Sequence, residues 1–227
     1  MTDYQEHLID SPTCVVAFAA SGGEFGDLDH YAFGNSLAKL GVAHVLMRDT
    51  RDYWYQHGVE GIGDDRAVTN YLTGLLETYP KVLLTGVSSG SYGALKYGQL
   101  TAQNVGGGFA PPRLGMIAIS PCTGLGEEVF PDFEAHWHHR IRRNPGDRPI
   151  VDLKVFYPIG PLCPARAFIS NGEGTELDRQ MARRIGIVNI TMIPGASHAG
   201  LGKLMRDRGD FERLFHAYPV VTHWGYL

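Results

Sequence analysis

A serine stands at the centre of a short, glycine-bounded segment whose composition suits a nucleophile. Residues Gly86–Gly90 read G-V-S-S-G, so Ser88 has a glycine at both of its second neighbours. A serine in this pattern occupies a sharp turn, where a side chain at either glycine position would collide with the neighbouring backbone. The turn lifts the hydroxyl above a sheet edge and directs the next N–H, at Ser89, toward an oxyanion. Ser89 and Ser91 are rival hydroxyls without glycines on both sides at this spacing. The alternative interpretation is an ordinary loop between a strand and a helix.

The patterning around this segment predicts the strand and the helix that such a turn requires. The apolar run Lys81–Thr85 precedes it and suits a buried strand, and a helix is expected over Ser89–Thr101. Elsewhere too, apolar runs alternate with stretches at helical spacing. Further strands are expected over Cys14–Ala20, Val42–Met47, Leu114–Ile119, Ala165–Ser170 and Val188–Ile193, and further helices over Tyr31–Leu40, Arg66–Tyr79, Glu176–Ile185 and Gly209–Ala217. This alternation predicts an α/β fold: a three-layer sandwich in which a mostly parallel sheet of about six strands carries helices on both faces.

One segment interrupts the alternation. The chain of 227 residues favours a single domain over 1–227, but the stretch 121–160 holds five prolines and is too irregular for a plain crossover. We interpret it as an insertion, a lid or a cap, in which Trp137 is a candidate substrate-binding residue. Its arginines at 140, 142, 143 and 148 are either a solvated face or an anchor for an anionic substrate or an acidic carrier protein.

The serine segment and its surroundings resemble the α/β-hydrolase superfamily, in particular its serine esterases and thioesterases. The stretch Gly86–Leu95 is similar to the nucleophile elbow of the esterases, in which G-x-S-x-G is often followed by G-Y-G-A-L; here Ser91 replaces the extra glycine, a change expected to tighten helix packing slightly. The resemblance covers about residues 13–217. It implies a reduced version of the fold, because the two N-terminal antiparallel strands of the family have no counterpart in the sequence pattern.

The resemblance also implies a catalytic triad in the order serine, acid, histidine. His198 follows the last expected strand in a glycine-bounded loop, where the family places its general base, and imidazole can take and return a proton near neutral pH. The acid is expected after the fifth strand. Thr175 stands where the family often has an aspartate, so Asp178, Glu176 and Glu173 remain candidates, with Asp178 preferred. Asp178 could instead cap the following helix.

The oxyanion hole and the pocket complete the expected site. The N–H of Ser89 is one donor, and the resemblance implies a second from the loop after the first strand, at Gly23 or Gly22; the alternative there is a plain strand-ending turn. Gly22 is also expected to contact the bound acyl group. Trp54 follows the second strand and either shapes the pocket or packs beneath its own loop.

Composition argues against several other classes of protein. A net charge of −4 does not suit a nucleic-acid binder, and three scattered cysteines without a CxxC pair do not suit a disulfide framework or a zinc ribbon. The acidic N-terminus and the absence of an apolar run of about 18 residues predict neither a signal peptide nor a membrane span, so we expect a cytoplasmic protein. The histidines at 136, 138 and 139 lack the further ligands of a zinc site, and there is no nucleotide-binding glycine motif, so neither a metal nor a cofactor is expected.

These observations predict a serine hydrolase that cleaves a small-molecule carboxylic ester or thioester, free or carrier-bound, through an acyl-enzyme on Ser88 with His198 as general base. Two alternatives stay open. An acyltransferase would use the same triad with an alcohol or amine in place of water. A catalytically silent binding protein on a hydrolase fold is favoured by Thr175 at the expected acid position.

Overall fold

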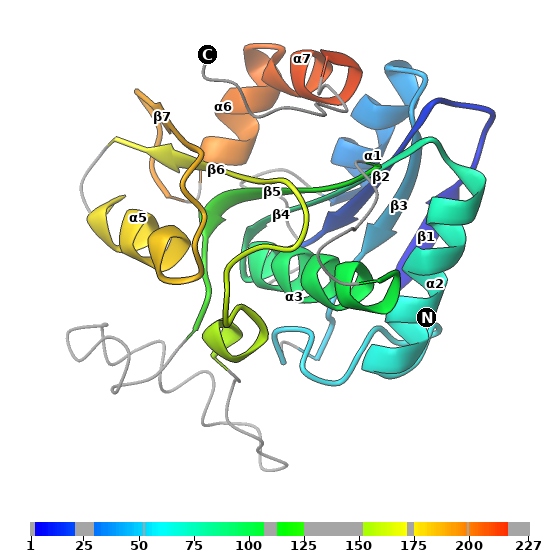
Figure 1. Cartoon of the computed structure of the whole chain (residues 1–227). Coiled ribbons are helices and arrows are strands. Elements are labelled where there is room, and N and C mark those ends of the chain that lie inside the picture. The colour runs from blue at the N-terminus through cyan, green and yellow to red at the C-terminus, as the bar shows by residue number, and fades with distance from the viewer. Residues whose placement is uncertain are drawn as a thin grey trace.

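The computed structural model describes residues 3–20, 30–51, 53–106, 113–124, 152–171, 175–198 and 200–217. Its centre is one seven-stranded sheet with the order β1-β3-β2-β4-β5-β6-β7 (Figure 1). The strands are β1 (Tyr4–His7), β2 (Thr13–Phe18), β3 (Ala43–Met47), β4 (Lys81–Ser88), β5 (Leu114–Pro121), β6 (Ala165–Ser170) and β7 (Ile190–Ile193). All neighbouring pairs are parallel except β1 with β3. The carboxyl ends of six strands therefore meet at one edge of the sheet.

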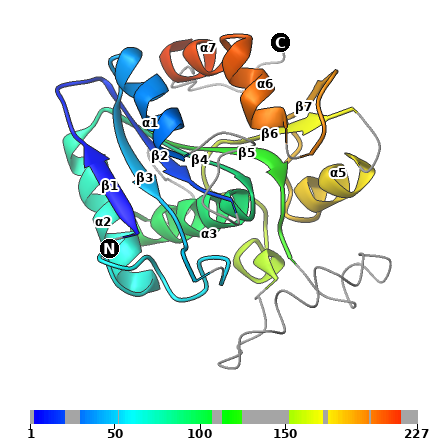
Figure 2. The ribbon, with the colours of Figure 1, turned by 180° about the vertical axis from the view of Figure 1, so that it is seen from behind.

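Helices cover both faces of the sheet because its central strands are apolar on both sides. In β2, Cys14, Val16 and Phe18 lie in one core cluster, whereas Val15 and Ala17 lie in the other. The first cluster takes side chains from α2 (Asp65–Thr78), α3 (Ser89–Asn104) and α5 (Thr175–Arg184), and the second from α1 (His30–Lys39), α6 (Leu201–Asp207) and α7 (Asp210–Ala217). The view from behind shows the same three layers (Figure 2). The predicted three-layer α/β sandwich is confirmed.

Two elements differ from the sequence prediction. The strand β1 was not expected, and it pairs antiparallel with β3 from Tyr4↔Met47 to His7↔His44, so one N-terminal antiparallel strand is present after all and the sheet has seven strands. It escapes a search for apolar runs because it is an edge strand whose sequence, YQEH, is mostly exposed. The short helix α6 was also missed.

The structure describes only the two ends of the expected insertion, residues 121–124 and 152–160. The strand β5 continues to Pro121, and a 3-10 turn, η1, spans Leu153–Phe156. Residues 125–151, which include Trp137 and the arginine and histidine clusters, lie outside the described residues. Within the described ranges, no helix is long and apolar enough to cross a membrane.

Candidate active site

The serine lies at a sharp junction between β4 and α3. Ser88 is the last residue of β4 and the N-cap of α3, with φ of 52° and ψ of −119°. The backbone packs so closely here that a Cβ on Gly86 would lie 2.1 Å from the carbonyl oxygen of Gly90, and one on Gly90 would lie 2.1 Å from that of Phe18. Since no real side chain tolerates such distances, glycine is required at both positions. The backbone therefore shows the collision that the G-x-S-x-G spacing predicts for any side chain at the two glycine positions.

A buried hydroxyl ties this junction to the neighbouring strand. Ser91 is 0% exposed. Its Oγ donates to the carbonyl oxygen of Ser88 at 2.5 Å and accepts from the backbone N–H of Cys122, directly after β5, at 2.8 Å. Ser91, which stands where the esterases have an extra glycine, therefore stabilises the elbow by hydrogen bonds. The sequence had indicated only slightly tighter helix packing at this position.

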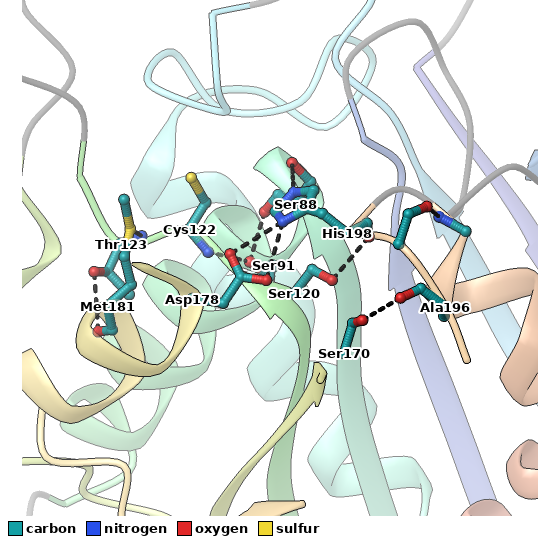
Figure 3. A network of polar contacts seen from close by, with 12 residues as sticks. Ser88, Ser91, Ser120, Cys122, Thr123, Ser170, Asp178, Met181, Ala196 and His198 are labelled. Carbon is teal, nitrogen blue, oxygen red and sulfur yellow. Dashed lines mark hydrogen bonds and ion pairs between the residues drawn. The ribbon is translucent and has the colours of Figure 1, made fainter. Parts of the chain in front are cut away.

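The histidine reaches Ser88 from the loop after β7. His198 Nε2 lies 3.1 Å from Ser88 Oγ, within hydrogen-bond distance (Figure 3). The two residues are 110 positions apart in the sequence and come together because parallel strands bring their carboxyl ends to one edge. The His198 side chain is 44% exposed, so the site is open to solvent on this side in the described part of the chain.

The acid on the other side of the imidazole is Asp178. Both of its carboxylate oxygens lie 3.0 Å from His198 Nδ1, and its side chain is only 5% exposed. The helix α5 begins at Thr175, so Asp178 lies inside the first turn and the capping alternative is wrong. Glu176 points elsewhere: its side chain is 57% exposed and pairs with Arg179 on the same helix.

The remaining acid candidate, Glu173, lies outside the described residues. Asp178 is the candidate that the structure brings to the histidine. Thr175, where the family often has its acid, begins α5, so the carboxylate arises from the next residues of the helix rather than from the loop. One carboxylate in contact with the imidazole is enough to complete a serine–histidine–acid arrangement.

Two contacts fix α5, and with it Asp178, against the extension of β5. The backbone N–H of Thr123 donates to Met181 Sδ at 3.1 Å, and Thr123 Oγ1 donates to the Met181 carbonyl oxygen at 3.1 Å (Figure 3). One turn further on, Arg184 forms a two-pronged ion pair with Asp152. The carboxylate is thus held by a rigid helix rather than by a loop.

The Cys122 thiol, which the Asp178 carboxylate influences, stays protonated. Burial raises the pKa of Cys122 well above its usual range, and the Asp178 carboxylate raises it further. Cys122 is therefore a neutral, buried side chain and does not compete with Ser88 as a nucleophile. Among the described residues, no group of three His, Cys, Asp or Glu side chains is arranged to hold a metal ion.

The other predicted site residues are placed less completely. Ser89 is the first residue of α3, where the helix dipole favours developing negative charge. Gly22 and Gly23 lie outside the described residues, as does Trp137. Trp54 is 4% exposed and packs edge-to-face on Tyr92 at a ring-centroid distance of 6.1 Å. Of the two alternatives for Trp54, this burial against α3 favours packing, and its role in the pocket stays a prediction.

Sequence reasoning missed the hydroxyls that hold the site together, which include Ser91 and two serines at the ends of β5 and β6. The strand ends read I-S-P and I-S-N, and a small hydroxyl residue there is too common to single out. The one available signal was Ser91 itself, since it departs from the glycine of the family's elbow.

Comparisons with known proteins identify the fold. A scan against protein-family models and a search of curated proteins both find no match. Solved structures match over nearly the whole chain. A carboxylesterase of the thaumarchaeon Nitrososphaera gargenis is 15% identical, with a TM-score of 0.56 over 96% of this chain and 94% of that chain.

Two further structures agree with it. Rv0554 of Mycobacterium tuberculosis is 15% identical, with a TM-score of 0.55 over 96% of this chain and 93% of that chain. MGS-MChE2, an α/β hydrolase from the sediment metagenome of the Mar Chica lagoon in Morocco, is 14% identical, with a TM-score of 0.52 over 95% and 94% of the two chains. The chain therefore has the α/β-hydrolase fold, as its elbow sequence predicts.

Proposed function

We propose that the protein is a serine hydrolase that cleaves a carboxylic ester or thioester through an acyl-enzyme. The observation that carries the proposal is the continuous chain of contacts from Ser88 Oγ through both nitrogens of His198 to the Asp178 carboxylate. A nucleophile, a base and an orienting acid in this order suit acyl transfer.

Each residue has a defined task in the proposed mechanism. Ser88 Oγ attacks the substrate carbonyl carbon while His198 Nε2 takes its proton. The imidazolium then gives this proton to the leaving group, and the carbonyl re-forms as an acyl ester on Ser88. A water, deprotonated by the same nitrogen, then attacks the acyl carbon. The imidazolium returns this proton to Ser88 Oγ as the acyl–Oγ bond breaks, which releases the carboxylic acid and regenerates the serine. Throughout, Asp178 accepts the hydrogen bond from Nδ1–H, which keeps Nε2 available and stabilises the imidazolium.

The oxyanion is stabilised by backbone donors in this proposal. The N–H of Ser89 follows the nucleophile directly at the start of α3. The second donor is the N–H of Gly23 or Gly22, a role implied by resemblance to the family. The contact of Asp178 with His198 supports an active enzyme over a silent binding protein, since Asp178, in the first turn of α5, supplies the acid that Thr175 does not.

Covalent labelling tests the proposal directly. A fluorophosphonate probe reacts with a serine only when the serine is activated by a base. We expect the wild-type protein to be labelled at Ser88, as located by peptide mass spectrometry, and to hydrolyse a nitrophenyl ester; carboxylesters come first because the N. gargenis enzyme of this fold is a carboxylesterase.

Matched variants make the labelling result specific. Ser88→Ala should lose both labelling and turnover while it stays folded. Ser11→Ala should keep both. Ser11 lies before the amino end of β2, away from the carboxyl ends of the strands that carry the site, and its Oγ donates to the carbonyl oxygen of Thr13 at 2.9 Å. Full turnover in Ser88→Ala, or labelling at another serine, would overturn the mechanism. Faster acyl transfer to an added alcohol than to water would instead identify an acyltransferase.

A further inference from the structure

The loop that carries His198 is held by two serine side chains from neighbouring strands. Ser120 Oγ, at the end of β5, donates to the backbone carbonyl oxygen of His198 itself at 2.8 Å. Ser170 Oγ, at the end of β6, donates to the carbonyl oxygen of Ala196 in the same loop. Both serines are 0% exposed. Figure 3 shows these two contacts side by side beneath the loop.

The backbone at Ser120 is distorted in the way that directs its side chain. Val87 pairs with Ile119, but Ser88 pairs with Pro121, so Ser120 is an extra residue in β5 opposite the nucleophile. Such a bulge re-aims a side chain and is common next to active sites. Ser120 also has φ of 45°, a left-handed conformation that costs energy for any residue other than glycine. A serine in place of a glycine here indicates that the hydroxyl has a task.

Among the described residues, few contacts hold the imidazole in place, so it depends on such an anchor. Its side chain is 44% exposed, so packing does not fix its position. Asp178 restrains Nδ1 through both carboxylate oxygens, but these contacts at the ring do not fix the backbone that carries it. Nε2 must stay within reach of Ser88 Oγ, now 3.1 Å away. A displacement of about 1 Å at a reacting group lowers a rate by about 100-fold.

We propose that Ser120 is a positioning residue: its hydroxyl fixes the main chain of His198 so that Nε2 stays aimed at Ser88. The inference rests on the proposed function, in which Nε2 is the base. Ser170 supports the same loop two residues earlier, at Ala196. The bulge in β5 therefore couples the strand beside the nucleophile to the base that activates it.

Two substitutions separate positioning from stability. Ser120→Ala removes the hydroxyl and keeps the strained φ, whereas Ser120→Gly removes the hydroxyl and relieves the strain. We expect both variants to lower kcat and the rate of fluorophosphonate labelling by about 10- to 100-fold, with KM changed less than about twofold. The melting temperature of Ser120→Gly should equal or exceed that of Ser120→Ala. Ser11→Ala is the matched control, since it also removes a buried hydroxyl that donates to a backbone carbonyl.

A spectroscopic readout keeps the inference independent of turnover. The proton between His198 Nδ1 and Asp178 gives a low-field proton NMR resonance, assigned by its loss in His198→Ala. It should persist in Ser88→Ala and Ser11→Ala, and should shift or broaden in both Ser120 variants. Recovery of wild-type kcat in Ser120→Gly would show that Ser120 acts through stability alone and would overturn the inference. An unchanged resonance in both Ser120 variants would overturn it as well, even if the wild-type protein proves to have no hydrolase activity.

Discussion

Replacement of Asp178 by asparagine is the sharpest test of the acid. The substitution keeps the size and shape of a side chain that is 5% exposed, so the fold should survive. It removes the negative charge that faces the imidazolium formed when Ser88 loses its proton. The asparagine amide can also donate a hydrogen bond to Nδ1. The imidazole then carries its proton on Nε2, and this nitrogen cannot accept the proton of Ser88.

The size of the effect follows from the distance. Two unit charges 3.0 Å apart attract by about 5.5 kcal/mol at an effective dielectric constant of about 20. The His198 side chain is 44% exposed, so water weakens this attraction, and we take about 3–5 kcal/mol, the usual cost of removing one partner of a buried ion pair, because Asp178 is only 5% exposed. Each 1.36 kcal/mol is about tenfold in rate, so we expect kcat to fall by about 10²- to 10⁴-fold, with KM nearly unchanged.

A control on the same helix makes the test specific. Glu176 is 57% exposed. Within the described residues it pairs with Arg179 and accepts a long hydrogen bond from Gln180, both on the same helix. Glu176→Gln should therefore leave kcat within about twofold and the free energy of unfolding within about 0.5 kcal/mol. The assay is steady-state hydrolysis of a small neutral ester, with labelling of Ser88 as a second readout. A larger loss in Glu176→Gln than in Asp178→Asn would refute the assignment of the acid.

Two further predictions concern buried polar side chains outside the triad. Ser91→Ala should lower the free energy of unfolding by about 1–3 kcal/mol in urea denaturation, since it leaves the buried N–H of Cys122 without its acceptor; unchanged stability would mean that another group replaces the hydroxyl. Burial lowers the pKa of His44 below its ordinary 6.5, so the unfolded chain binds this proton more readily than the folded one. The contribution of neutral His44 to the free energy of unfolding is therefore fully present above pH 6.5 and decreases below it. His44→Gln should make this decrease smaller, as measured by denaturation at about pH 7 and pH 5.

The sequence predicted most of the central sheet because buried parallel strands are continuous apolar runs. The strand β6 was predicted with its observed bounds, and β2, β3 and β5 within a few residues. The edge strand β1 was not predicted, since its residues are mostly exposed and polar and lack this signal. Strands that are buried on both faces are therefore readable from the sequence as apolar runs, whereas a mostly exposed strand such as β1 is not.

The site divides in the same way. The elbow has a local signature: glycine is needed at 86 and 90 because a Cβ at either position would lie 2.1 Å from a backbone carbonyl oxygen, and the spacing of these glycines alone pointed to Ser88. By itself the sequence predicted the candidate nucleophile, the loop of the candidate base and a short set of candidate acids. Only the tertiary structure selected Asp178, because the choice depends on which carboxylate of α5 faces the loop after β7. It alone also brought Ser91 and Ser120 to the elbow and the base, since hydrogen bonds between separate strands depend on register and on a bulge that no local pattern announces.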